Sequence, residues 1–370
     1  MKVPFLDLKS AYLELQNEIN VSIGRILSGG IYVLGGEVES FESEWSDYVE
    51  SEFCASLGCG LDALILALKA LNIGFGDEVL VPSHTFIATW LAVSEVGAIP
   101  ISVEPNFETY NLDPSQLASN ITSKTKAVIV THLYGQPADL CAIKEVAEAN
   151  DLFIIEDAAQ AHGATYHQKR IGSFGDIVCW SFYPAKNLGA FGDGGAITTN
   201  SERIWNQVKL LRNYGSASKY EHIIRGLNSR LDPIQAAVLR IKLRYLDQWN
   251  SRRVQIAQNY TDALKQCDVV LPAVLDNVEP AWHLYVVQIS NREAVQSRLS
   301  ALGIQTLIHY PVPPADQPAY ARAHSGRTLG ASDQLRNLSH TLLSLPIGPH
   351  LSTAQVGYVI ASLKNIIATN

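Results

Sequence analysis

The chain has 370 residues, of which 47% are hydrophobic and 17% are charged, and its formal net charge is −8 at pH 7. This composition is typical of a globular protein with a sizeable buried core, and it excludes a disordered or fibrous chain. The acidic balance also argues against a nucleic-acid partner, because no excess of cations is present to displace the counterions of phosphates. At about 150 residues per domain, two or three domains are expected.

The first residues, MKVPFLDLKSAYLELQ, mix charged and apolar side chains and contain no apolar segment typical of a signal peptide. No apolar run reaches the roughly 18 residues that a membrane span needs. The five cysteines form no C-x-x-C pair, and no His, Cys and carboxylate set has metal-ligand spacing. We therefore expect a cytoplasmic protein with reduced thiols, no metal site and no membrane partner.

The first half of the chain alternates helical patterns with short apolar runs. Helices are expected at 10–27, 61–71, 85–96 and 139–150, and strands at 79–81, 99–103, 127–131 and 152–156. Asp113 followed by Pro114 is expected to cap and begin a further helix. Strands that alternate with helices predict an α/β fold with a mostly parallel central sheet and helices on both faces.

The pattern changes after Gly175. Strands are expected at 177–181 and 195–199, then a helix from Pro233 capped by Asp232, and a long polar helix at about 243–265. We expect a large domain at residues 1–245 and a small C-terminal α+β domain at residues 246–370. Further elements are expected in the small domain, with strands near 282–288 and 304–309 and helices near 292–302, 332–340 and 352–367.

Two positions carry the chemistry. Asp157 ends the predicted strand at 152–156, where parallel α/β sheets place ligands, although an aspartate there can equally cap a helix. Lys186 lies in the apolar, aromatic and glycine-rich segment SFYPAKNLGAFGDGG. Most lysines are solvated surface charges, but such surroundings lower the pKa of a lysine and free its amine for Schiff-base chemistry.

An acidic residue at a strand end with a downstream lysine fits pyridoxal 5′-phosphate (PLP). The lysine binds the cofactor aldehyde, and the carboxylate keeps the pyridine nitrogen protonated, so that the ring can accept electrons. Gly60 and Leu61 open the predicted helix at 61–71, where backbone N–H groups can hold a phosphate. A glycine before a helix is a weak signal alone, but its place ahead of the other two supports this interpretation.

Over about residues 3–363 the chain resembles the sugar-nucleotide aminotransferases of the DegT group, which have PLP fold type I. The stretches that carry the resemblance include GLDAL at 60–64, VPSHTFIATW at 81–90, IEDAAQAHGA at 155–164, SFYPAKNLGAFGDGGA at 181–196, LNSRLDPIQAA at 227–237 and IHYPVPPADQPAY at 308–320. The combination is highly specific, whereas each stretch alone is not. Two departures, Cys59 before the glycine and Ala185 before the lysine, remove no reacting group.

The resemblance implies a role for each matching cofactor residue. Lys186 holds the cofactor and moves the proton, and Asp157 pairs with the pyridine nitrogen. Gln160 bonds the ring hydroxyl, Phe86 stacks on the ring, and Ser181 binds the phosphate together with Gly60 and Leu61. Asn228 reaches the phosphate of a neighbouring subunit, so a homodimer with shared active sites is implied. For Phe86 and Asn228, a core aromatic and a turn asparagine are the alternative interpretations.

For the substrate, the resemblance implies Tyr183, His309 and Tyr310 near the hexose, with Lys219 from the partner subunit, while His162 receives no role. The motifs HLYGQ, GLDA and HYP favour amination at C3 by their similarity to the C3 aminotransferases. The implied reaction transfers the amino group of L-glutamate, through the pyridoxamine 5′-phosphate (PMP) form of the cofactor, to a dTDP-3-keto-6-deoxyhexose, which yields a dTDP-3-amino-3,6-dideoxyhexose.

Other functions are weighed against this one. A C4 aminotransferase, or one that acts on a UDP-linked keto sugar, keeps the same fold. A dehydratase of this fold has histidine in place of Lys186, and a non-catalytic regulatory homologue does not need Lys186 or Asp157. A nicotinamide-binding domain is rejected because the glycines at 192, 194 and 195 lack the G-x-G-x-x-G spacing and open no helix.

Overall fold

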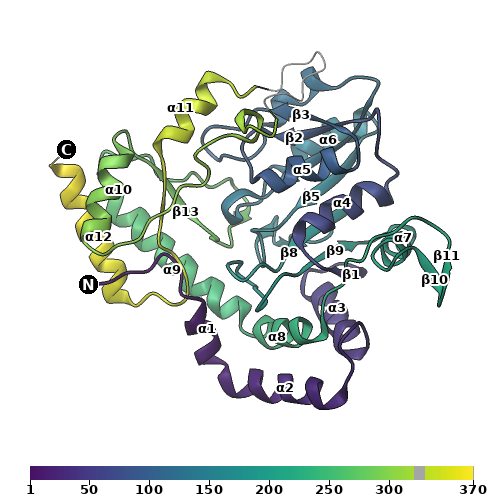
Figure 1. Cartoon of the computed structure of the whole chain (residues 1–370). Helices are drawn as coiled ribbons and strands as arrows, with labels where there is room; N and C mark the ends of the chain where they lie inside the picture. The colour runs from purple at the N-terminus through teal and green to yellow at the C-terminus, as the bar shows by residue number, and fades with distance from the viewer. Residues whose placement is uncertain (321–329, 370) are drawn as a thin grey trace.

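The computed structural model describes residues 1–320 and 330–369, and a seven-stranded sheet forms its centre (Figure 1). The strand order is β1-β9-β8-β5-β4-β2-β3. β9 runs opposite to the other six strands and pairs antiparallel with β1 and β8. The remaining pairs are parallel, so the sheet is mostly parallel, as predicted. The strands are β1 (Phe53–Leu57), β2 (Glu78–Pro82), β3 (Ile99–Val103), β4 (Thr125–Thr131), β5 (Phe153–Asp157), β8 (Ile177–Ser181) and β9 (Gly195–Thr199).

Helices cover both faces of this sheet. Neighbouring strand residues alternate between two cores, since Ile154 packs on one side and Ile155 on the other. The first core also takes residues from α3 (Gly36–Tyr48), α6 (Leu140–Ala149) and α8 (Pro233–Leu243). The second takes residues from α4 (Gly60–Ala70), α5 (Ile87–Glu95) and α7 (Glu202–Leu211). The predicted α/β class is therefore confirmed.

The register of the sheet places Asp157 at the carboxyl end of its central strand, β5. Asp157 pairs with Thr131 of β4 on one side and with Cys179 of β8 on the other. Ligand sites of parallel α/β sheets lie beyond the carboxyl ends of the strands. The loop after β8, which contains Lys186, begins at this edge.

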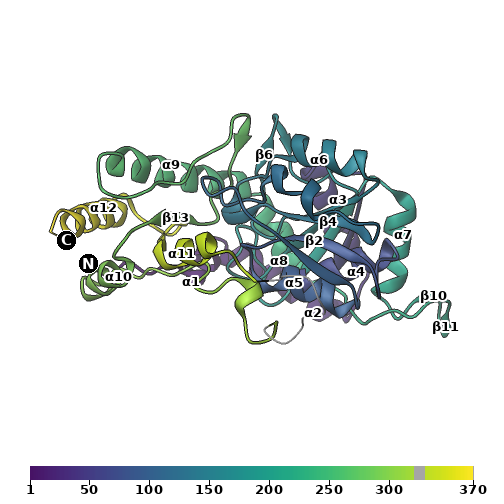
Figure 2. The same ribbon diagram turned by 90° about the horizontal axis from the view of Figure 1, so that it is seen from above.

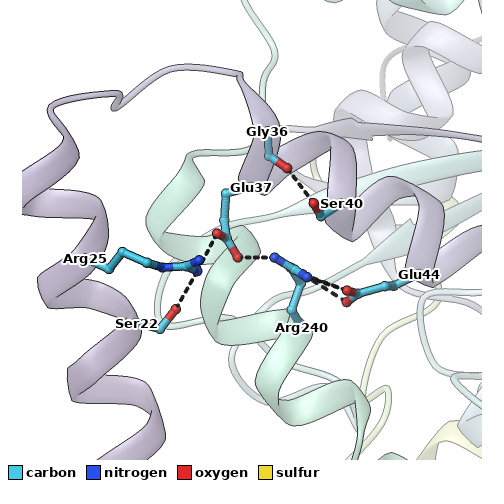
Figure 3. A network of polar contacts seen from close by, with 7 residues as sticks. All are labelled: Ser22, Arg25, Gly36, Glu37, Ser40, Glu44 and Arg240. Atoms are coloured by element: carbon cyan, nitrogen blue, oxygen red, sulfur yellow. Dashed lines mark hydrogen bonds and ion pairs between the residues drawn. The ribbon is translucent and has the colours of Figure 1, made fainter.

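The N-terminal helix α2 runs along α8 and is tied to its neighbours by charged side chains. α1 (Leu8–Glu14) leads into α2 (Gln16–Gly29), which packs against α8 (Figure 1). Arg240 on α8 contacts Glu37 at 2.7 Å and Glu44 at 2.5 Å, both on α3, and Glu37 also pairs with Arg25 of α2 at 2.7 Å (Figure 3). The three helices therefore share one ion-pair network, which is better placed to add stability than an isolated surface pair.

The C-terminal part of the chain builds a separate apolar core, which also takes in Val3 from the N-terminus. Val3 bridges Ile304, so the first residues lie beside the C-terminal part in Figure 1. We propose that the boundary between the two domains lies between residues 245 and 246, because the C-terminal part has its own apolar core. The elements are α9 (Leu246–Leu264), β13 (Tyr285–Gln288), α10 (Arg292–Ala301), α11 (Asp333–Thr341), β14 (Leu342–Leu345) and α12 (Thr353–Ala368).

Several expected elements were wrong. The helix at 10–27 is broken at Leu15, whereas the long polar helix expected at about 243–265 is confirmed as α9, Leu246–Leu264. The segment after Asp113 forms only a short 3-10 helix, Pro114–Gln116. No strand forms at 304–309. Ile304 bridges Val3 and Leu307 bridges Ser344, and both bridges are isolated. Asp232 precedes α8 without a side-chain capping bond.

Candidate active site

Asp157 is a buried carboxylate, only 7% exposed, at the carboxyl end of β5. Its Oδ2 accepts a hydrogen bond from Thr89 Oγ1 at 2.9 Å, and its Oδ1 accepts one from the Ala159 N–H at 3.2 Å. Burial raises the pKa of Asp157, whereas these two donors and Lys186 oppose the rise. A carboxylate has about four acceptor positions, so Asp157 keeps capacity to bind a protonated ring nitrogen.

Lys186 lies in the loop between β8 and β9. Its backbone N–H bonds the Tyr183 carbonyl at 2.8 Å, and a Cβ on Gly189 would lie 2.4 Å from the Pro184 carbonyl oxygen, so the loop is tightly folded. Burial lowers the pKa of Lys186 to about 8, and Asp157 acts in the opposite direction. Within the described part of the chain, the Lys186 amine makes no hydrogen bond or ion pair. Lys186 therefore carries the partly neutral amine that attack on an aldehyde requires.

The start of α4 and the end of β8 meet closely enough to form a phosphate cradle. A Cβ on Gly60 would lie 2.6 Å from Ser181 Cβ, so only glycine fits without a shift of the backbone. Cys59 caps α4 by accepting a bond from the Asp62 N–H at 3.4 Å, and the N–H groups of Gly60 and Leu61 lie at the open helix end. The N–H groups at a helix N-terminus attract anions.

The expected ring and sugar residues gather beside this edge. Gln160 donates to the Tyr310 hydroxyl at 3.1 Å, and the Phe86 ring lies 5.7 Å from the Tyr310 ring, tilted by 40°. Phe86 and Tyr183 are each 54% exposed, as an open ligand face requires. His309 Nδ1 bonds Ser344 Oγ at 2.8 Å, and burial and Lys186 lower its pKa to about 4, so His309 is neutral at pH 7.

Two predicted residues lie outside this group within one chain. Lys219 is exposed at the turn between β10 (Ser216–Ser218) and β11 (Glu221–His222), a hairpin that projects from the body of the molecule (Figure 2). Asn228 is also exposed and bridges Asn213. Their roles on a neighbouring subunit stay predictions.

Other polar residues at this edge were not predicted from the sequence. Thr89 binds Asp157, and Ser229 donates to Asp62 at 2.6 Å, which ties the segment after Asn228 to the start of α4. His84 and Tyr134 bond each other at 2.8 Å. A polar residue inside the apolar run IATWLAV was the available signal for Thr89, whereas no local pattern identifies the others.

His162 lies in an aromatic surrounding. Its ring is 5.5 Å from the Trp180 ring and 5.8 Å from the Phe182 ring, and neither ring nitrogen has a partner among the described residues. Burial and, to a smaller degree, Lys186 lower its pKa to about 3, so the imidazole is neutral. In residues 1–320 and 330–369, no group of three or more His, Cys, Asp or Glu could hold a metal ion. No helix there has both the length and the apolarity to cross a membrane.

The residues at this edge fit PLP. They supply an amine without a partner at Lys186, a buried carboxylate at Asp157, and a cradle between Gly60 and Ser181 that a Cβ would fill. Together with the mostly parallel sheet, they define a PLP-dependent enzyme of the α/β class.

Comparison with known proteins gives the family. The model of the DegT/DnrJ/EryC1/StrS aminotransferase family matches residues 14–364, and the chain belongs to this family. The chain is 48% identical to a dTDP-3-amino-3,4,6-trideoxy-alpha-D-glucose transaminase of Streptomyces venezuelae, with 98% of this chain and 96% of the relative covered. It is also 48% identical to a dTDP-3-amino-3,6-dideoxy-alpha-D-galactopyranose transaminase of Aneurinibacillus thermoaerophilus, with 98% and 99% covered.

A third relative carries a different kind of name. The chain is 50% identical to the erythromycin biosynthesis sensory transduction protein EryC1 of Saccharopolyspora erythraea, with 98% and 99% of the two chains covered.

Solved structures agree on the fold. DesV of S. venezuelae in complex with a ketimine intermediate has a TM-score of 0.95 at 48% identity, with 98% of each chain covered. NtdA of Bacillus subtilis with bound PMP has a TM-score of 0.90 at 28% identity, with 99% and 85% covered.

Proposed function

We propose that the chain transfers the amino group of L-glutamate to C3 of a dTDP-3-keto-6-deoxyhexose, which yields 2-oxoglutarate and a dTDP-3-amino-3,6-dideoxyhexose. The observation that carries the proposal is the placement of Lys186 and Asp157 at one sheet edge, with His309 and Tyr310 beside them. Two relatives at 48% identity are named for dTDP-linked 3-amino sugars, which supports the nucleotide and the position of the amine.

The chemistry divides between the cofactor and the chain. When bound, PLP supplies the electron sink that lets an amino acid and a keto sugar exchange an amino group. Lys186 Nζ accepts and returns a proton near neutral pH, because burial holds its pKa at about 8. Asp157, held by Thr89 and Ala159, keeps a proton on the ring nitrogen. Gly60, Leu61 and Ser181 bind the phosphate end, Phe86 covers the ring, and Gln160 orients the ring hydroxyl.

The sugar contacts are proposed for neutral groups. His309 has its pKa lowered to about 4, and burial also raises the pKa of Tyr310, so at pH 7 both side chains offer hydrogen bonds without charge. Neutral donors and acceptors suit the hydroxyl and keto oxygens of a hexose. Tyr183, which is exposed at the loop before Lys186, adds a further hydroxyl. Each of these roles is part of the proposal.

The dimer is also a proposal. Lys219 and Asn228 are exposed in a single chain, and the hairpin that carries Lys219 projects away from the body (Figure 2), so both are available to a second copy. Three consecutive apolar residues just after α2, Ile31, Tyr32 and Val33, are at least 50% exposed. Such a patch is typical of an interface.

The five cysteines are free, which supports a cytoplasmic location.

Two alternatives compete with this function. Relatives at 39% identity are named for UDP-linked sugars, among them a UDP-2-acetamido-2-deoxy-3-oxo-D-glucuronate aminotransferase of Pseudomonas aeruginosa, so a UDP sugar is the second candidate substrate. The name of EryC1 raises a regulatory role. Lys186 and Asp157 argue against a non-catalytic protein, because a sensor has no need for a reactive amine beside a buried carboxylate.

The test is product analysis. The purified PLP-loaded enzyme would receive L-glutamate and, in parallel, dTDP-linked and UDP-linked keto sugars with the keto group at C3 or C4. We expect a dTDP-3-amino sugar by mass spectrometry and NMR, with Lys186→Ala inactive. Turnover of only a UDP-linked or a 4-keto sugar would replace the substrate assignment. Absence of turnover with all of them would favour the regulatory role.

A further inference from the structure

We propose that His84 and Tyr134 are positioning residues that hold the His309–Tyr310 segment at the active site through a two-step hydrogen-bond chain. The inference rests on the proposed function only for the identity of the sugar that His309 and Tyr310 would contact. Neither His84 nor Tyr134 belongs to the cofactor and substrate residues assigned above.

Tyr134 joins three parts of the site. Its N–H donates to Gln160 Oε1 at 2.6 Å, its carbonyl accepts from the Leu284 N–H at 3.2 Å, and its hydroxyl donates to the His309 carbonyl. Tyr134 itself is only 6% exposed and has a left-handed backbone, with φ of 61°. A non-glycine residue in this conformation is uncommon and persists where the surroundings fix it.

The residue after Tyr134 shows how closely the two parts of the chain meet. A Cβ on Gly135 would lie 2.8 Å from the backbone nitrogen of His283 and 2.9 Å from the backbone carbonyl oxygen of Gln160. The φ angle of Gly135 is +95°. The Gly135 carbonyl also accepts a bond from the Ala281 N–H at 2.8 Å. The turn at Tyr134 is therefore clamped between the Gln160 segment and the segment that leads into β13.

The order of the protons follows from the chemistry of each group. The His309 carbonyl can only accept, so the single hydroxyl proton of Tyr134 points to it. The bond of 2.8 Å between His84 Nε2 and Tyr134 OH must then be donated by His84. His84 is 1% exposed and burial lowers its pKa to about 4, so it is neutral and carries its one proton on Nε2. The chain therefore runs from His84 through Tyr134 to His309.

This chain acts on the backbone of the segment, whereas its two side chains bond other residues. The His309 ring bonds Ser344, and the Tyr310 hydroxyl accepts from Gln160. If Tyr134 lost its hydroxyl, the His309 carbonyl would be left without this donor, which would loosen the segment without removing a substrate contact. Loss of a buried hydrogen bond of this kind costs about a factor of ten in an equilibrium.

Tyr110 offers a matched control. Its ring lies 5.7 Å from the Tyr134 ring and 6.4 Å from the His84 ring, so it belongs to the same aromatic group. Its hydroxyl accepts a bond from Gln288 at 3.1 Å and makes none to His309. Tyr110→Phe therefore removes the hydroxyl of another buried tyrosine, which the proposal does not use.

The experiment compares four variants: Tyr134→Phe, His84→Leu, His84→Gln and Tyr110→Phe. The two half-reactions are measured separately, by the absorbance change with L-glutamate and by amine transfer from the PMP-loaded enzyme to the dTDP-keto sugar. We expect Tyr134→Phe and His84→Leu to raise the KM for the sugar about tenfold while the L-glutamate half-reaction changes less than about twofold. His84→Gln, whose amide can donate in place of Nε2, should recover most of the loss, and Tyr110→Phe should match the wild type.

Crystal structures of the wild type, Tyr134→Phe and Tyr110→Phe give a readout that needs no activity. We expect the His309 carbonyl and the Tyr310 backbone to be displaced in Tyr134→Phe only. An undisplaced segment, an equal loss in both half-reactions, or an equal effect of Tyr110→Phe would overturn the proposal. If the wild type aminates no dTDP sugar, the proposed function fails, whereas the crystal structures still decide whether the chain positions the segment.

Discussion

Gly60→Ala is the substitution whose effect follows most directly from the geometry. The new methyl group would lie 2.6 Å from Ser181 Cβ and 3.2 Å from Ser181 Cα. Carbon atoms in contact are normally about 3.5–4.0 Å apart. The start of α4 or the end of β8 must therefore move by about 1 Å. Both belong to the proposed phosphate cradle, so the shift should weaken PLP binding.

The size of the effect can be bounded. Overpacking at a close contact costs about 1–3 kcal/mol. If PLP binding needs the original geometry, this cost appears as a rise of about 5- to 140-fold in the Kd for PLP, since 1.4 kcal/mol corresponds to a factor of ten. Gly24→Ala is the control, because Gly24 lies within α2 with nothing within 4 Å of the new Cβ. That change should stabilise the helix by about 0.5–1 kcal/mol and leave the Kd unchanged.

The assay is titration of the cofactor-free proteins with PLP, followed by fluorescence quenching and by thermal unfolding with and without PLP. We expect a weaker Kd and a smaller PLP-induced rise in Tm for Gly60→Ala only. A Kd equal to that of the wild type would refute the assignment of the cradle to Gly60 and Ser181.

Three further predictions concern the reacting groups. Thr89→Val removes the hydroxyl bound to Asp157, so the pKa of Asp157 should rise further and the acid limb of the kcat–pH profile should move to higher pH; an unmoved limb would contradict this role. In cofactor-free protein, Lys186→Met should raise Tm at pH 7, since a lowered pKa means that the folded state holds the charged amine at a cost. That gain should shrink from about pH 8 towards 10.5 as the unfolded chain binds more protons than the folded one, and a constant gain would count against it. Mixing inactive Lys186→Ala with Asn228→Ala chains should restore part of the activity, whereas no recovery would argue against sites shared between subunits.

The parts of the fold that depend on local pattern were predictable from the sequence. The strands at 99–103, 177–181 and 195–199 were located to the residue, because each is a short apolar run bounded by turn-forming residues. The helix α3 was not predicted, because its segment GEVESFESEWSDY is rich in acidic residues that mask the buried Phe41 and Trp45.

The same distinction applies to the site. Asp157 and Lys186 could be proposed from the sequence because each stands in a characteristic local segment. The bond from Thr89 to Asp157 joins residues 68 positions apart, and the bond from Tyr134 to His309 joins residues 175 positions apart. Such contacts depend on which strands become neighbours in the sheet and on how the C-terminal part folds back, and neither is encoded in a short segment. The positions of Lys219 and Asn228 relative to a second subunit depend on an interface, which is also beyond local pattern.

The most direct test of the central claim is the absorbance spectrum of the purified protein with PLP, recorded before and after addition of L-glutamate. We predict a visible band from the cofactor bound to Lys186, which L-glutamate replaces with the shorter-wavelength band of the PMP form; Lys186→Ala should lack the first band. PLP binding without any response to L-glutamate would contradict the proposed amino donor. Failure to bind PLP at all would contradict the assignment of Lys186 and Asp157.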